Sequence, residues 1–118
     1  MPDADGRDDH PVLDHRSLDA GNNVYATLRG PLRTAAAAER FERAGWTCRS
    51  SSWHGYEVET GWCQVELDPI EQGATLLNGV IVPEALDALA SLLTEFGLGF
   101  TLELYDEEGG LLRELRSR

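Results

Sequence analysis

Apolar and polar positions change their period several times along the chain, and each change marks the end of a predicted element. Residues 24–29 (VYATLR) alternate side chains as a strand with one buried face does. Gly30-Pro31 interrupts this alternation, and residues 32–44 then place apolar side chains at helical spacing. Gly45 follows at the position where helices commonly end in a left-handed residue. The pattern predicts a strand followed by a helix.

The same order of signals returns in the second half of the chain. Residues 80–82 are predicted as strand, Pro83 opens a second helix, and Gly97 ends it. Both the proline and the glycine lie 52 residues after their counterparts around the first helix. Strand patterns follow each helix, at 46–50 and at 100–105. A duplicated β-α-β-β unit explains this repetition, and so does the independent use of proline and glycine at the ends of two unrelated helices.

The stretch from Ser51 to Leu67 predicts an antiparallel hairpin. A two-residue turn at Thr60-Gly61 makes one face apolar, with Tyr56, Val58, Cys63 and Val65. The other face then carries Glu57, Glu59, Trp62, Gln64 and Glu66. An alternative is one long strand with a bulge at Gly61.

A second hairpin is predicted at the end of the chain. Residues 100–105 alternate, residues 106–109 turn the chain, and the register places Leu104 opposite Leu111 and Phe100 opposite Leu115. Between the two hairpins, Asn78-Gly79 is a strong turn signal, which predicts either a tight hairpin turn or a bulge before the next strand.

Taken together, these elements predict an α+β fold in the order β-α-β-β-β-β-α-β-β. We expect an antiparallel-rich sheet of six or seven strands, with two helices packed on one face, as a single domain over residues 24–118. Residues 1–23 contain six aspartates and few apolar side chains. Such a composition cannot offset the entropy of ordering, so this segment is predicted to be a disordered acidic tail.

Charge narrows the range of partners. The chain of 118 residues has a net charge of −11, and all ten of its basic residues are arginines. None lies between Arg49 and Arg113, an interval that contains twelve carboxylates. Such a field repels phosphate groups, so nucleic acid and anionic membranes are not expected as partners. It attracts basic surfaces, and a basic protein is the expected partner.

The chain shows no apolar leader segment, which predicts a cytoplasmic protein in which Cys48 and Cys63 remain free thiols. Cys63 falls on the apolar face of its hairpin, where burial makes a thiol less reactive. His54 is the only histidine in residues 24–118, and no convergent ligand set accompanies it. The sequence therefore predicts no catalytic residue, metal or cofactor.

The candidate site is a group of aromatic and acidic residues around the first hairpin. Tryptophan and tyrosine are common anchors of interface energy, and a loop can present Trp53 and His54 to a partner. If Trp62 is exposed among glutamates, it adds an aromatic contact for an arginine-rich surface. The predicted binding residues are Trp53, His54, Tyr56, Glu57, Glu59, Trp62 and Glu66.

Three functions from different classes remain open. The first is a non-enzymatic, acidic interaction module for a basic protein, in one concrete form an immunity or antitoxin-type inhibitor. The second is a small-molecule-binding domain or cryptic enzyme with a pocket near Trp53, His54 and Tyr56. The third is a homodimer in which exposed strands or helix faces pair.

Overall fold

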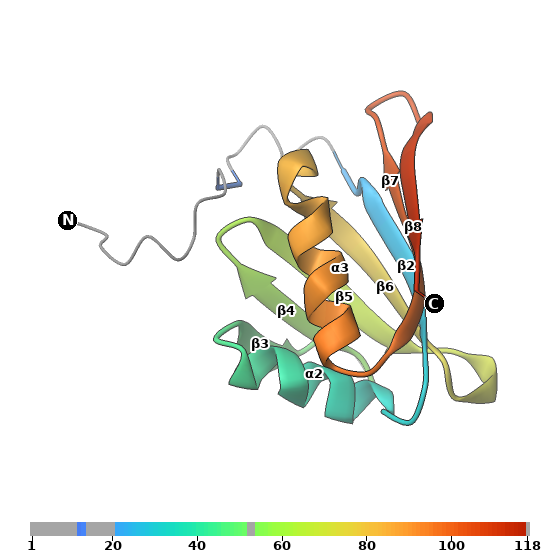
Figure 1. Ribbon diagram of the computed structural model, residues 1–118. Helices are drawn as coiled ribbons and strands as arrows, with labels where there is room; N and C mark the ends of the chain where they lie inside the picture. Colours follow the sequence, from blue (N-terminus) through green and yellow to red (C-terminus); the bar gives the residue numbers. More distant parts are fainter. Residues whose placement is uncertain (1–11, 14–20, 52–53, 118) are drawn as a thin grey trace.

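The computed structural model describes residues 12–13, 21–51 and 54–117, which form one seven-stranded sheet and two α-helices (Figure 1). The helices are α2 (Thr34–Arg43) and α3 (Leu86–Glu95), with short 3-10 turns at η1 (Glu71–Gly73) and η2 (Pro83–Ala85). The strands are β2 (Val24–Arg29), β3 (Thr47–Ser50), β4 (Tyr56–Thr60), β5 (Cys63–Pro69), β6 (Thr75–Ile81), β7 (Gly99–Tyr105) and β8 (Leu111–Arg116). Both the α+β fold class and the order of elements are confirmed.

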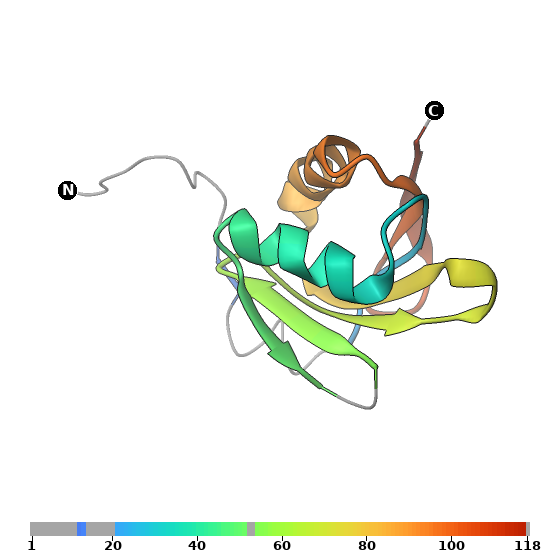
Figure 2. The same ribbon diagram turned by 90° about the horizontal axis from the view of Figure 1, so that it is seen from below.

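All neighbouring strands are antiparallel, in the spatial order β3-β4-β5-β6-β2-β7-β8. Each helix therefore connects two strands that run in the same direction: α2 leads from β2 to the edge strand β3, and α3 leads from β6 to β7 across β2. Both helices cover the same face of the sheet (Figure 2). Among the described residues no helix lies on the opposite face, and we call it the open face.

The ends of the two helices repeat, whereas the strand pairing does not. Each helix has ten residues, and α3 begins 52 residues after α2. Gly45 and Gly97 both adopt positive φ, and the next residue of each, Trp46 or Leu98, donates a backbone hydrogen bond back into its helix. In the sheet, however, three strands separate β3 from β2, whereas only β2 separates β7 from β6.

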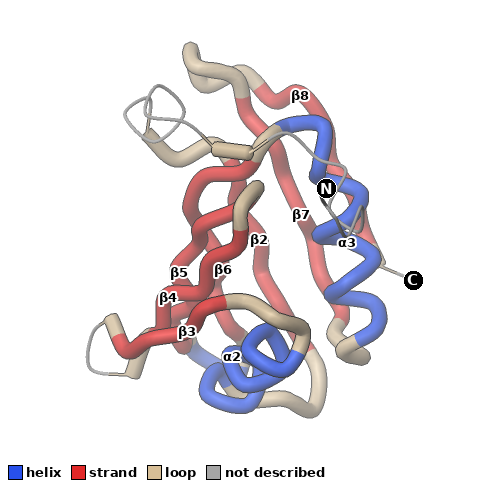
Figure 3. The backbone as a smooth tube through the Cα atoms, turned by 90° about the vertical axis from the view of Figure 1, so that its left-hand side faces the viewer, coloured by secondary structure: helices blue, strands red, loops and turns tan. Residues whose placement is uncertain are grey.

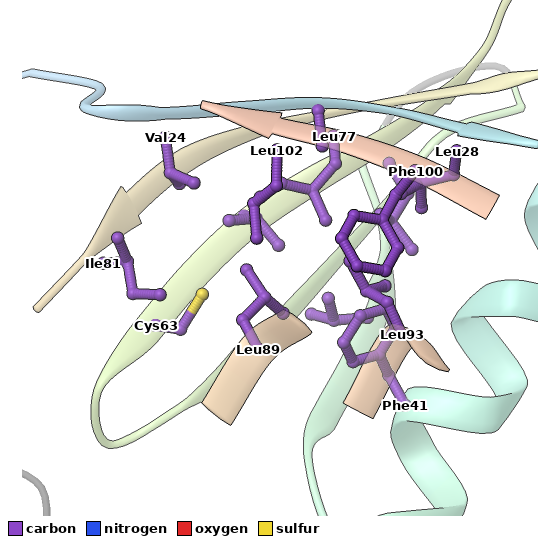
Figure 4. Packing of buried hydrophobic residues seen from close by; sticks show 14 of the residues in the cluster. Val24, Leu28, Phe41, Cys63, Leu77, Ile81, Leu89, Leu93, Phe100 and Leu102 are labelled. Atoms are coloured by element: carbon purple, nitrogen blue, oxygen red, sulfur yellow. The ribbon is translucent and has the colours of Figure 1, made fainter. Parts of the chain in front are cut away.

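The core fills the space between the helices and the covered face of the sheet. Helix α2 packs on β3, β4 and β5, and α3 packs on β7 (Figure 3). Side chains from both helices and from the sheet meet in this layer (Figure 4). Four aromatic rings in mutual contact connect the helix layer with the first hairpin. The centroid of the Phe41 ring lies 4.7 Å from that of Trp46 and 5.0 Å from that of Phe96, and the Trp46 and Trp62 centroids are 5.3 Å apart.

The turn of the first hairpin lies at Gly61-Trp62, one residue later than predicted. Thr60 pairs with Cys63 and Val58 pairs with Val65. The register therefore differs from the predicted one by two residues, which leaves every strand side chain on its predicted face because the side-chain period is two. Two residues change their places: Trp62 moves from a strand position into the turn, and Thr60 moves from the turn into β4.

The predicted register of the last hairpin is wrong. Leu104 pairs with Arg113 instead of Leu111, and Leu102 pairs with Leu115. The cause is a bulge at the start of β8, where an additional residue interrupts the ladder. As a result Leu111 and Leu112 are both about half exposed, at 52% and 53%.

Asn78-Gly79 forms neither of the predicted structures, because both residues lie within β6 and pair without a break to β2 and β5. Glycine is required there for another reason. A Cβ atom on Gly79 would lie 2.6 Å from the Cα atom of Val65 and in steric overlap with the backbone oxygen of Gln64.

Most of the predicted acidic tail lies outside the described residues. Of the part that is described, Leu13 donates a backbone hydrogen bond to the Gly61 carbonyl at 2.8 Å and packs against the core. Asn23 donates one to the Gly79 carbonyl at 2.8 Å. Within the described residues, neither helix is long and apolar enough to cross a membrane.

Candidate binding face and cleft

The seven predicted binding residues do not form one cluster. Trp53 lies outside the described residues. The expectation that Trp62 is exposed is wrong: the ring is only 9% exposed, because the turn directs it into the core against Trp46. His54 is exposed in the loop between β3 and β4, whereas Tyr56 faces the helix layer and lines a groove beside α2. Among the described residues, the groove that Tyr56 lines does not include His54.

The three predicted glutamates do lie together, on the open face. Glu57 pairs directly with Glu66 across β4 and β5, and Glu59 lies on the same side of β4. The pairing continues through one residue of every strand. This cross-strand row consists of Arg49, Glu57, Glu66, Asn78, Tyr25, Glu103 and Glu114.

Arginines neutralise the two ends of this row. At the β3 edge, Arg49 forms an ion pair with Glu57 and lies 4.0 Å from Glu59. At the β8 edge, Arg116 forms an ion pair with Glu114. In the middle, Glu66 and Glu103 form no ion pair with any arginine that the structure describes, and neither does the adjacent Asp68. Unneutralised negative charge is therefore concentrated at the centre of the open face.

A cleft of about 790 Å³ continues this acidic centre toward one end of the sheet. It lies where β2 begins and β7 ends, beside the β7–β8 hairpin. Its lining combines polar groups from residues 21–25 and 103–107 with apolar side chains that include Val80 of β6. The residues that matter for its chemistry are Asn22, Tyr25, Val80, Glu103, Tyr105 and Leu112.

Two tyrosines form the aromatic part of the cleft. The rings of Tyr25 and Tyr105 meet edge to face, with centroids 5.6 Å apart and planes at 81°. The Tyr105 hydroxyl donates a hydrogen bond to Glu103 Oε1 at 2.9 Å. This hydrogen bond, together with the nearby negative charge, raises the pKa of Tyr105 above its ordinary value, because ionisation would place a second anion beside the carboxylate.

Sequence reasoning missed Tyr25, Glu103 and Tyr105. Each stands at a polar position of a correctly predicted strand, so its side of the strand was available from the alternation. The sequence pattern does not indicate that β2 pairs with β7. This pairing is what places Tyr25 opposite Glu103.

Both cysteine thiols lie in surroundings that raise their pKa. Burial raises the pKa of the Cys63 thiol far above its ordinary value, and burial together with Glu42 raises that of Cys48. Neither thiol is thus activated as a nucleophile. In the described ranges, no three histidine, cysteine or acidic side chains come close enough to hold a metal ion.

Comparison of the chain with protein-family models, with curated proteins and with solved structures finds no match. The function is therefore inferred from the chemistry of the open face and its cleft alone.

Proposed function

We propose that this protein is a non-enzymatic binding domain whose open face engages a basic protein partner. The observation that carries the proposal is the position of Tyr25, which is 38% exposed and lies in the cross-strand row between Asn78 and Glu103, within the acidic centre. An exposed aromatic ring bordered by unpaired carboxylates suits a basic surface, because the ring supplies contact area while the carboxylates attract the cations.

Charge supports this function through the rate of association. A net charge of −11 attracts a basic partner over a distance and orients it toward the side with most unpaired acid. Three further carboxylates of the β7–β8 hairpin, Asp106, Glu107 and Glu108, extend the acidic centre beyond the sheet. An inhibitor that covers the cationic surface of an enzyme, as immunity and antitoxin proteins do, is the specific form that we propose.

The cleft favours a second candidate function, the binding of a small molecule. Its volume of about 790 Å³ is typical of ligand sites, and its lining mixes apolar side chains with a few polar groups. This candidate predicts a defined ligand that remains bound to the protein during purification under native conditions. Mass spectrometry of the native protein tests it, and a mass equal to the chain alone contradicts it.

Affinity capture from the native host tests the first proposal. The test variant is E66Q/D68N/E103Q, which removes the unpaired charge of the open face. The matched control is E39Q/E84Q/E95Q, which removes the same charge from exposed positions near the helices. A basic protein that is recovered by the wild type and the control, lost with the test variant and released by salt supports the proposal. Equal recovery by both variants, or a partner insensitive to salt, contradicts it.

A further inference from the structure

The cleft on the open face has the composition of a site for one planar cation. Part of its lining is apolar, since it includes Leu112 and also Val80 of β6, which is only 7% exposed. The lining also includes Tyr25, which is 38% exposed, and Glu103. A group that fills this space must combine an apolar stem with a positively charged end.

The two tyrosines favour a flat cation over a compact one. Because their rings meet at 81°, their faces point in two directions, and Tyr25 remains 38% exposed at the cleft. A guanidinium group stacks on such a face and also binds carboxylates through two parallel hydrogen bonds. An ammonium group does neither as well, since it is compact and strongly hydrated.

Acceptors for the cation are present on both sides of the cleft. Glu103 uses Oε1 to accept the Tyr105 hydroxyl, and no described group donates to its Oε2. Asn22 donates through Nδ2 to Asn78 at 2.9 Å, and no described group donates to its Oδ1. Asp106 is different, since its Oδ1 already accepts the backbone N–H groups of Glu108 and Gly110 and holds the hairpin turn. The carboxylates also exclude anionic ligands.

We infer that the cleft binds an arginine side chain of the partner, with its guanidinium stacked on Tyr25 and hydrogen-bonded to Glu103, and its stem against Val80 and Leu112. This inference rests on the proposed function, because it names the residue through which the basic partner is anchored. The inference goes beyond the proposed function because it requires arginine, whereas a site that acts by charge attraction alone would bind lysine equally well.

Two peptides of equal charge test the inference on the full chain. One is a blocked peptide of alternating arginine and serine, and the other has lysine in place of every arginine. We expect the arginine peptide to bind about two- to fivefold more tightly, as stacking on an exposed aromatic ring implies. Tyr25→Leu and Glu103→Gln should each abolish this preference while the lysine peptide keeps most of its affinity. Glu95→Gln, on α3, serves as the matched charge control and should leave the preference unchanged.

Chemical shifts of the labelled protein give a second measurement that does not depend on affinity. The arginine peptide should shift the amide signals of Tyr25, Glu103 and Tyr105 more than the lysine peptide does. Equal affinities of the two peptides for the wild type, or a preference that survives in Tyr25→Leu, overturn the inference and leave the proposed function standing. If neither peptide binds the open face with an affinity that falls with salt, the proposed function itself fails.

Discussion

The side-chain amide of Asn23 pairs with the backbone of Ile81 as if it were another strand residue. The Ile81 N–H donates to Asn23 Oδ1 at 2.9 Å, and Asn23 Nδ2 donates to the Ile81 carbonyl at 2.9 Å. On its other side, the Asn23 carbonyl accepts the Tyr105 N–H at 2.8 Å. One residue thus joins the ends of β6 and β7 immediately before β2 begins, and it holds together the segments that form the cleft.

Asn23→Ala should therefore lower the free energy of unfolding by about 1–3 kcal/mol, because two partly buried hydrogen bonds are lost and the Ile81 groups lose their partners. Urea denaturation measures the change. Asn22→Ala is the matched control, since its amide makes one exposed hydrogen bond to Asn78. An effect of Asn22→Ala as large as that of Asn23→Ala would show that the pairing with Ile81 contributes nothing.

Gly79→Ala should destabilise the protein by at least about 2 kcal/mol, because the new methyl group overlaps the backbone of β5 at Gln64 and Val65 and the sheet must open to admit it. At Gly99, in β7, a Cβ atom would lie 3.4 Å from the Ser117 side chain, which can move. Gly99→Ala is thus the control with a smaller expected effect. Thermal unfolding of the two variants gives the comparison, and a Gly79→Ala protein as stable as Gly99→Ala would contradict the close approach.

Trp62→Ala should cost about 3–5 kcal/mol of unfolding free energy, since it removes a buried ring that packs edge to face on Trp46 and leaves a cavity. Leu111→Ala, at a residue 52% exposed, should change the stability by less than about 0.5 kcal/mol. If chemical denaturation shows only a small effect of Trp62→Ala, the ring is not buried in solution, and Trp62 becomes a candidate binding residue again.

The parts of this fold that could be predicted are those encoded by neighbouring residues. Alternation identified β2, β4, β5 and β7, whereas for β6, which spans Thr75–Ile81, only residues 80–82 were predicted as strand. Gly45 and Gly97 located the helix ends because a left-handed residue is needed there. The errors arose where contact with a strand distant in the sequence determines the local structure. Gly79 carries a turn signal, yet the approach of β5 explains why glycine stands there.

The candidate site was predictable only in part for the same reason. The open face of Glu57, Glu59 and Glu66 followed from the period of the strands, and the structure confirms that they share one side. The cleft depends on β2 lying between β6 and β7, which no local pattern expresses. Tyr25 and Tyr105 are 80 residues apart in the chain and in ring contact in the fold.

The raised pKa of Tyr105 gives a pH test of the cleft in the absence of any partner. The Glu103 carboxylate stabilises the neutral phenol by accepting a hydrogen bond from its hydroxyl, so the folded protein holds the phenol proton more tightly than the unfolded chain does. The resulting stabilisation is complete below the pKa of an unfolded tyrosine and is lost as the pH rises through the higher pKa of the folded state. Glu103→Gln should lower the pKa of Tyr105 toward its ordinary value, whereas Glu95→Gln, on α3, should not change it. Ultraviolet titration of tyrosinate, with Tyr105→Phe to assign the signal, measures both effects. If Tyr105 titrates alike in the wild type and in Glu103→Gln, the hydrogen bond between Tyr105 and Glu103 does not form in solution, and the position of the carboxylate that the cleft requires is contradicted.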